Sequence, residues 1–159
     1  MFPDDGFREL ARHECLRLMA KAPVGRIVYT RQALPAVSPV NFSLEADGAV
    51  VLRAPAALDL ARAVDGAVVA FEADDVDTAR QSGWSVVITG SATVVTDPAE
   101  HDGLTRTGPV SWAPASEEVF IRIEPELVTG RELLGGRAGY GVDHGPRWFP
   151  GPPGSCAAC

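Results

Sequence analysis

The sequence predicts a small, mainly β (α+β) domain: an antiparallel barrel of about six strands with two or three short helices. Val-, Ile- and Thr-rich runs of strand length recur along the chain and are separated by turn residues, as in small barrels. The alternation of strands and long helices that marks a parallel nucleotide-binding sheet is missing. A chain of 159 residues corresponds to one domain with one core.

The first third of the chain predicts one helix followed by three strands. Asp4 and Asp5 can cap a helix whose apolar residues recur at roughly helical spacing until Pro23 ends it. Residues 45–48 end in Asp-Gly and predict a hairpin turn between the second and third strands. The three strands are expected at residues 26–30, 36–44 and 49–53.

The middle of the chain predicts a short helix and two further strands. The helix is expected at residues 58–64. Residues 67–73 predict a strand buried on both faces, because four consecutive side chains in it are apolar. An acidic connection at residues 74–77 leads to the longest β-rich stretch, residues 83–96. Gly90 interrupts that stretch and predicts a bend that helps to close the barrel.

The last part of the chain predicts a short helix, two strands and a tail. Asp97 and Pro98 provide a helix cap and a first-turn proline. Strands are expected at residues 119–123 and 127–133. After Gly135 the composition is dominated by Gly and Pro without periodicity, so we expect a domain at residues 1–134 and a flexible tail at residues 135–159.

Composition and charge exclude several classes of partner. The formal net charge of −7 repels phosphate backbones and no basic stripe is present, so we expect no nucleic acid as a partner. No apolar run approaches the ~20 residues of a membrane span, so we expect no membrane association. The N-terminus lacks the basic and apolar regions of a signal peptide, and we expect a cytoplasmic protein.

Metal-binding and catalytic motifs are missing from the sequence. The cysteines and histidines show no ligand spacing that predicts a metal site, since one Cys-x-x-C pair lies in the tail and the histidines are scattered. The glycine-rich and histidine motifs of hydrolases, metalloproteases and nucleotide-binding proteins are also missing. We therefore expect any chemistry to depend on a cofactor, and we name no catalytic residue.

A series of short segments, in order across residues 7–133, resembles the pyridoxamine 5′-phosphate oxidase-like flavoproteins. That resemblance implies a split β-barrel, a homodimer, and FMN lying in the groove between the subunits. Some relatives use a deazaflavin instead. The segments are Val-Gly-Arg-Ile-Val at residues 24–28, Pro-Val-Asn-Phe at 39–42, Val-Val-Leu-Arg at 50–53, Val-Val-Ala-Phe-Glu at 68–72, Gly-Trp-Ser-Val at 83–86 and Ile-Arg-Ile-Glu-Pro at 121–125.

Within this resemblance, Pro39, Val40, Asn41 and Phe42 are candidate cofactor contacts. A flavin ring needs an apolar wall and backbone hydrogen-bonding groups along its polar edge, and a strand presents both. Asn41 can hydrogen-bond that edge, and Phe42 can pack at the ring. The alternative is that Val40 and Phe42 are ordinary core residues and that Asn41 satisfies a turn.

Arg53 stands where the family often begins its phosphate site, and a guanidinium suits phosphate recognition. Many relatives continue with a hydroxyl residue, a glycine and a lysine. Here Asp59 lies about where the lysine is expected, and an anion there would repel phosphate. Arg62 can restore the positive charge. The alternative is an exposed arginine at the end of a strand.

Trp84 and Trp112 complete the set of candidate cofactor contacts, since a large flat ring can stack on a cofactor. Trp84 can equally anchor the core, and Trp112 can close over the site from the partner chain. Arg122 lies between two isoleucines and is interpreted as a surface charge.

The first hypothesis for function is a homodimeric oxidoreductase that uses FMN, or alternatively a deazaflavin, and acts on a small molecule. The second is a dimeric barrel that binds a ligand or a partner without catalysis and has lost the flavin phosphate site. A haem-binding relative is the weakest alternative, because it depends on His13, His101 or His144 as an axial ligand.

Overall fold

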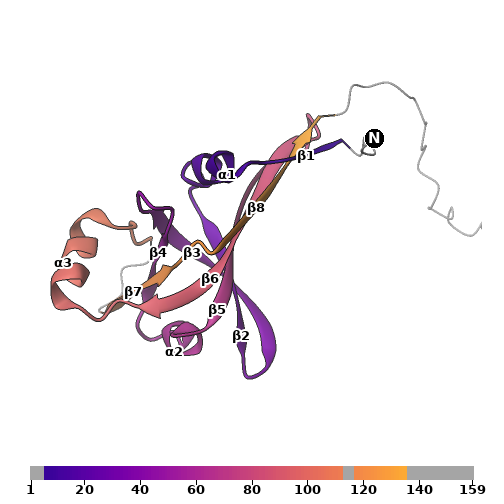
Figure 1. The fold of residues 1–159 in the computed structure, drawn as a ribbon. Coiled ribbons are helices and arrows are strands. Elements are labelled where there is room, and N and C mark those ends of the chain that lie inside the picture. The colour runs from indigo at the N-terminus through magenta and orange to yellow at the C-terminus, as the bar shows by residue number, and fades with distance from the viewer. Residues whose placement is uncertain (1–5, 113–116, 136–159) are drawn as a thin grey trace, which may run out of the picture.

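A computed structural model describes residues 6–112 and 117–135 (Figure 1). The described residues form three helices and eight strands. In chain order the elements are β1 (Phe7–Glu9), α1 (Arg12–Met19), β2 (Gly25–Arg31), β3 (Leu34–Leu44), β4 (Val50–Pro55), α2 (Leu60–Val64), β5 (Val68–Asp77), β6 (Ser82–Val94), α3 (Pro98–Thr107), β7 (Glu118–Ile123) and β8 (Leu127–Leu134). No helix among these residues is long and apolar enough to cross a membrane.

The strands form one antiparallel sheet that closes into a barrel of six strands. Their order is β1-β8-β6-β5-β2-β3-β4-β7, and an additional pairing of β6 with β7 closes strands β2 to β7 on themselves. Strands β8 and β1 extend the sheet beyond the barrel as a flat blade, seen at the upper right of Figure 1. The predicted split barrel with short helices is therefore confirmed.

Gly90 marks the corner at which β6 changes partners. Up to Thr89 this strand pairs with β8, and from Ala92 it pairs with β7. A Cβ atom at Gly90 would overlap the backbone carbonyl of Glu124, so only glycine lets the two segments approach here. The bend predicted at this glycine is confirmed.

The core fills the barrel and continues beneath two helices. Phe42 contacts Phe71 with ring centroids 4.8 Å apart. Helix α1 adds buried Cys15 and Met19, and α2 adds buried Leu60 and Val64. A smaller cluster lies between the barrel and α3 and consists of Val51, Val95 and Phe120, with Leu104 packed against them.

The helix predicted from Asp4 begins later than expected. Residues 7–9 form β1 and pair with β8, with Phe7 opposite Leu133, so sheet pairing overrides the helical spacing of the apolar residues. The helix starts where the backbone amide of Ala11 donates to the Glu14 carboxylate at 2.8 Å.

The interpretation of residues 67–77 was wrong in two respects. The acidic connection at residues 74–77 is the continuation of β5, which pairs with β6 as far as Asp77. The strand is buried on one face only, because Val68 is 66% exposed while Phe71 is fully buried. Its other face, which carries Val68 and Ala70 and then Glu72 and Asp74, is open to solvent in the single chain.

Several turn and cap predictions are confirmed. Gly48 has a φ of 90° in the turn between β3 and β4, as expected from the Asp-Gly pair. The Asp97 side chain accepts a hydrogen bond from the Glu100 amide at 2.9 Å, and Pro98 is the first residue of α3. The predicted tail lies outside the described residues, so the domain boundary stays a prediction.

Candidate functional site

Strands β3 and β4 separate at one corner of the barrel, and most of the candidate residues lie there. Residues 34–40 of β3 pair with β2, whereas pairing with β4 begins at Asn41, which lies opposite Arg53. Arg53 lies in turn opposite Phe120 of β7. Among the described residues no strand pairs with the other edge of β3 over residues 34–40, so this edge is available to a ligand.

The four candidate residues of β3 divide between the two faces of the strand. Val40 and Phe42 are half-buried and pack against the main core, as the alternative interpretation expected. Pro39 is exposed and Asn41 is half-buried on the opposite face. Side chains available to a ligand are therefore those of Pro39 and Asn41, and contacts of Val40 or Phe42 with a cofactor stay predictions.

Arg53 is held by the protein itself. Its Nε donates to Glu118 Oε2 at 2.6 Å, and its Nη2 donates to the same carboxylate oxygen. Its Nη1 donates to the backbone carbonyl of Pro109 at 3.1 Å. The guanidinium lies over the Phe120 ring at 5.5 Å. The side chains of Arg53 and Glu118 are only 17% and 14% exposed. Phosphate would have to displace a carboxylate here, and the role of Arg53 at a phosphate stays a prediction.

The segment after α3 is attached to this corner. Hydrogen bonds from Arg53 and from the Ser111 side chain hold the pKa of Glu118 below its ordinary value. The ring nitrogen Nε2 of His101 lies 3.2 Å from the backbone oxygen of Glu118. Trp112 follows this anchored segment and is 67% exposed, so a large flat ring is presented to solvent beside the corner.

Trp84 lies away from this corner in the same chain. It is half-buried against the main core and pairs with Asp75 on one side and with Glu132 on the other. Strands β5 and β2 separate its strand from β3, which corresponds to about 14 Å across the sheet. One chain therefore does not bring Trp84 together with Asn41 and Trp112.

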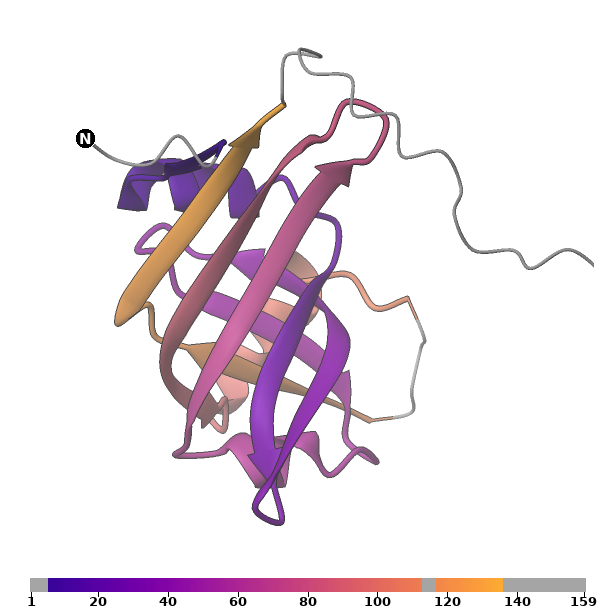
Figure 2. The ribbon, with the colours of Figure 1, turned by 90° about the vertical axis from the view of Figure 1, so that its right-hand side faces the viewer.

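No described helix covers the outer surface of the sheet between Trp84 and the β3–β4 corner. In Figure 2 the strands β8, β6, β5 and β2 face the viewer, and the described helices lie behind or below them. One row of paired residues crosses this surface and is apolar apart from one threonine. It consists of Val37, Val28, Ala70, Thr89 and Leu127. We call this surface the open face.

One hollow of the described residues, about 570 Å³, lies over β6 and β8 and is lined in part by Ser85, Val87, Thr129 and Arg131. Another, about 360 Å³, lies between the end of β2 and α2 and is lined by Thr30, Arg31, Gln32, Asp59, Arg62 and Ala63. Sequence reasoning found Asp59 and Arg62 but missed Arg31, because nothing local shows which strand end α2 will meet.

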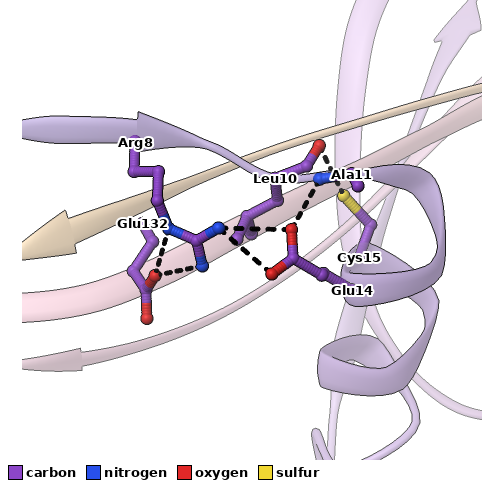
Figure 3. Close-up of polar contacts among 6 residues, drawn as sticks. All are labelled: Arg8, Leu10, Ala11, Glu14, Cys15 and Glu132. Carbon is purple, nitrogen blue, oxygen red and sulfur yellow. Dashed lines mark hydrogen bonds and ion pairs between the residues drawn. The ribbon is translucent and has the colours of Figure 1, made fainter.

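The polar cluster at the N-terminal strand is structural. Arg8 bonds Glu132 of β8 at 2.6 Å and Glu14 of α1 at 3.1 Å, which joins β1 to both β8 and α1 (Figure 3). Cys15 is fully buried, with its Sγ 3.8 Å from the carbonyl oxygen of Leu10. Burial raises the pKa of the Cys15 thiol, so this cysteine is an inert core residue.

Other polar candidates also have structural partners. Arg122 is half-buried rather than a free surface charge, and it bonds Glu45 at 2.7 Å and also Glu100. Both carboxylates raise the pKa of Arg122, and the hydrogen bond to Glu45 is the largest cause. His101 packs edge-on against Phe120. The described part of the chain contains no group of three or more metal-ligating side chains.

The chain matches the family model described as pyridoxamine 5′-phosphate oxidase over residues 11–132. It is 45% identical over 134 residues to the uncharacterized protein Rv0080 of Mycobacterium tuberculosis, a match covering 79% of this chain and 85% of that protein. The structure of the FAD binding protein from Mycobacterium smegmatis is also similar, with 31% identity, a TM-score of 0.67, and coverage of 79% of this chain and 98% of that one.

A conserved protein of unknown function from Corynebacterium diphtheriae has a similar structure, with 31% identity, a TM-score of 0.69, and coverage of 81% of this chain and 99% of that one. The family match covers most of the barrel, including the corner between β3 and β4. The chain therefore belongs to the pyridoxamine 5′-phosphate oxidase-like family of split-barrel proteins.

Proposed function

We propose that the protein is a homodimeric, flavin-dependent oxidoreductase acting on a small molecule, with FMN as the cofactor between two subunits. The observation that carries this proposal is the open face, an uncovered sheet surface that is crossed by an apolar row and bordered by the candidate residues at the β3–β4 corner. FAD and a deazaflavin are the alternative cofactors. Because the chain is similar to an FAD binding protein, the affinity for FAD has to be measured beside that for FMN.

The open face supports association of two copies. Val37, Val68 and Leu127 are 59%, 66% and 58% exposed on it. A strand that is apolar on both faces is expected where both faces are buried, yet the chain alone covers only one face of β5. A second copy packed here would bury the other face.

The β3–β4 corner has the chemistry expected of a flavin ring site. Asn41 offers an amide beside the unpaired edge of β3, and the exposed ring of Trp112 offers a flat apolar surface. Trp84 is too far from this corner within one chain, so in this proposal it acts from the second copy. Pro39 completes the corner, with Val40 and Phe42 supporting it from the core side.

A bound flavin would supply the transfer of hydride or electrons, and the protein residues would orient it and exclude water. Glu118 is a carboxylate at the corner in contact with Arg53, and Arg53 is the main cause of its lowered pKa. It is therefore no proton donor near neutral pH. We assign Arg53 to holding Glu118 and the Trp112 segment, in addition to its predicted role toward the cofactor.

The test is the visible absorption spectrum of the purified protein, followed by titrations with FMN, FAD and the deazaflavin, and by sedimentation velocity. We expect a yellow protein or saturable binding of FMN, and a dimer. A colourless protein that binds none of the three would contradict the oxidoreductase function.

The alternative function is a dimer that binds a ligand or a partner without redox chemistry. Asp59 favours it, because an anion stands where many relatives place a lysine, and so does the engagement of Arg53 by Glu118. A dimer that binds no flavin in the same titrations is the result expected for this alternative.

A further inference from the structure

We propose that ion pairs between two copies of the chain determine how the copies pack on the open face, with Arg131 of each copy paired with Asp74 of the other. This inference rests on the dimer of the proposed function and adds the contacts that fix its arrangement. The two residues lie on the part of the open face toward the blade, outside the apolar row described above.

Arg131 and Asp74 project from the same side of the sheet. A Cβ atom at Gly130 would lie 2.7 Å from the Sγ of Cys15 in α1, so Gly130 faces that helix. Because side chains alternate along a strand, Arg131 projects from the opposite side, which is the open face. Ser85 of β6 is paired with Arg131 on one side and with Asp74 on the other, so the three residues form one row across β8, β6 and β5.

The charges of this region are only partly neutralised within one chain. Arg26 is shared between Glu72 at 3.0 Å and Asp74 at 3.2 Å, so two carboxylates have one cation between them. Arg131 is exposed and makes no ion pair with any residue that the structure describes, although Glu9 lies opposite it on β1. An unpaired cation therefore lies on β8 and an excess carboxylate on β5, with β6 between them.

This arrangement is complementary to itself, which favours a second copy of the chain over an unrelated partner. A two-fold axis that runs near β6 exchanges β8 with β5, as in the isologous interfaces of dimers. Each β8 residue on the open face then lies over the β5 residue of its own row. The resulting pairs are Leu127 with Ala70, Thr129 with Glu72, Arg131 with Asp74, and Leu133 with Val76. Apolar side chains thus meet apolar ones, and a hydroxyl and a guanidinium each meet a carboxylate.

The surface also has room for these contacts. The hollow of about 570 Å³ over β6 and β8 is lined in part by Ser85, Thr129 and Arg131, so a side chain of the second copy can enter it. Packed sheets lie about 10 Å apart, and a long arginine side chain can meet a facing carboxylate between them. An axis along β5 would instead place Asp74 over Asp74 and Glu72 over Glu72. Repulsion between those like charges disfavours that alternative.

Charge reversal tests the pairing by sedimentation velocity of the full-length protein over a range of concentrations. We expect Arg131→Glu and Asp74→Arg each to raise the dimer dissociation constant at least 100-fold, about 2.7 kcal/mol, because each change sets like charges against each other. An equimolar mixture of the two variants should associate again, because each mixed dimer regains two ion pairs of opposite charge.

Arg17→Glu is the matched control, since Arg17 is an exposed arginine of α1, on the other side of the sheet. It should leave the dissociation constant unchanged, and urea unfolding checks that every variant folds. A measurement that needs no variant is the effect of salt, which should weaken the wild-type dimer by screening the ion pairs.

The outcomes separate this inference from the proposed function. Wild-type affinity in both single variants, a mixture that does not associate, or a dimer insensitive to salt would overturn the pairing while the dimer itself remained. A wild-type protein that is monomeric at every concentration would contradict the dimer and the pairing together. The flavin titrations test the cofactor independently of either result.

Discussion

The two outer surfaces of the barrel differ in whether the chain itself covers them. Over β4 and β7, helix α3 buries Val51 and Phe120 completely, and the arginines there are bonded to carboxylates. Over β2, β5 and β6 no described helix lies on the sheet, and Val68 is 66% exposed. The covered face is therefore complete within one chain, whereas the open face stays uncovered, and it is the surface on which we propose that a second copy packs.

The largest effect is expected at the corner that joins the two faces. Gly90→Val would drive a side chain into the backbone of Glu124, so we expect loss of more than about 4 kcal/mol and no folded protein. The measurement is the yield of soluble protein and its urea unfolding curve.

Gly103→Ala is the control for that substitution. Gly103 lies in α3 with open space around it, so alanine should stabilise the helix by about 0.5–1 kcal/mol. A folded Gly90→Val variant of normal stability would contradict the close approach at the corner.

The next largest effect tests the open face directly. Val68→Asp places a charge in the proposed dimer interface, and we expect the dimer dissociation constant to rise at least 100-fold, about 2.7 kcal/mol, with little change in the fold. Sedimentation velocity over a range of concentrations measures it. Ala99→Asp adds the same charge on α3, on the covered side, and should leave the dimer intact. Equal effects of both variants would remove the distinction between the faces.

The covered face can be weakened by removing one cation. Arg122 joins the β3–β4 turn to α3 through Glu45 and Glu100, and its side chain is 24% exposed. We expect Arg122→Met to lower the free energy of unfolding by about 2 kcal/mol, because charged hydrogen bonds shielded from water are lost. Arg8→Met removes two ion pairs at 45% exposure, and the loss should be smaller. Urea unfolding of both variants gives the comparison, and a larger loss for Arg8→Met would contradict it.

The smallest effect is a dependence of stability on pH. The pKa of Glu118 is lower in the folded protein than in the unfolded chain, mainly because of Arg53. Its contribution to stability is therefore present at neutral pH and is lost as pH falls below about 4.3, toward the folded-state pKa. Urea unfolding between pH 7 and pH 3 should show a weaker acid dependence in Glu118→Gln than in the wild type. An unchanged dependence would show that this carboxylate is not specially stabilised.

Local patterns predicted most of the strands, and they failed where a distant segment decides the structure. The Asp-Gly turn, the Asp97 cap and the bend at Gly90 depend on neighbouring residues or on glycine itself and were predictable. The helix start was misplaced because residues 7–9 pair with β8, more than a hundred residues further along the chain. Pairing of that kind leaves no local signal.

The candidate site was only partly predictable for the same reason. The order of the family-like segments placed Asn41 and Arg53 on adjacent strands, and the register puts them opposite each other. The partner of Arg53 is Glu118, 65 residues away, and no spacing indicates it. Arg31 was missed because its contact with Asp59 depends on where the start of α2 packs.

The sequence by itself determined where most of the strands lie along the chain, several of the turns, and the run of apolar residues at the start of β5, since these follow from local composition and spacing. Only the tertiary structure decided which face of β5 the core covers, and which arginines are bound to carboxylates. The physical reason is that burial and ion pairing depend on segments far apart in the chain meeting in space, and those contacts bind Arg53 to Glu118 in a largely buried pair and Arg31 to Asp59 in an exposed one.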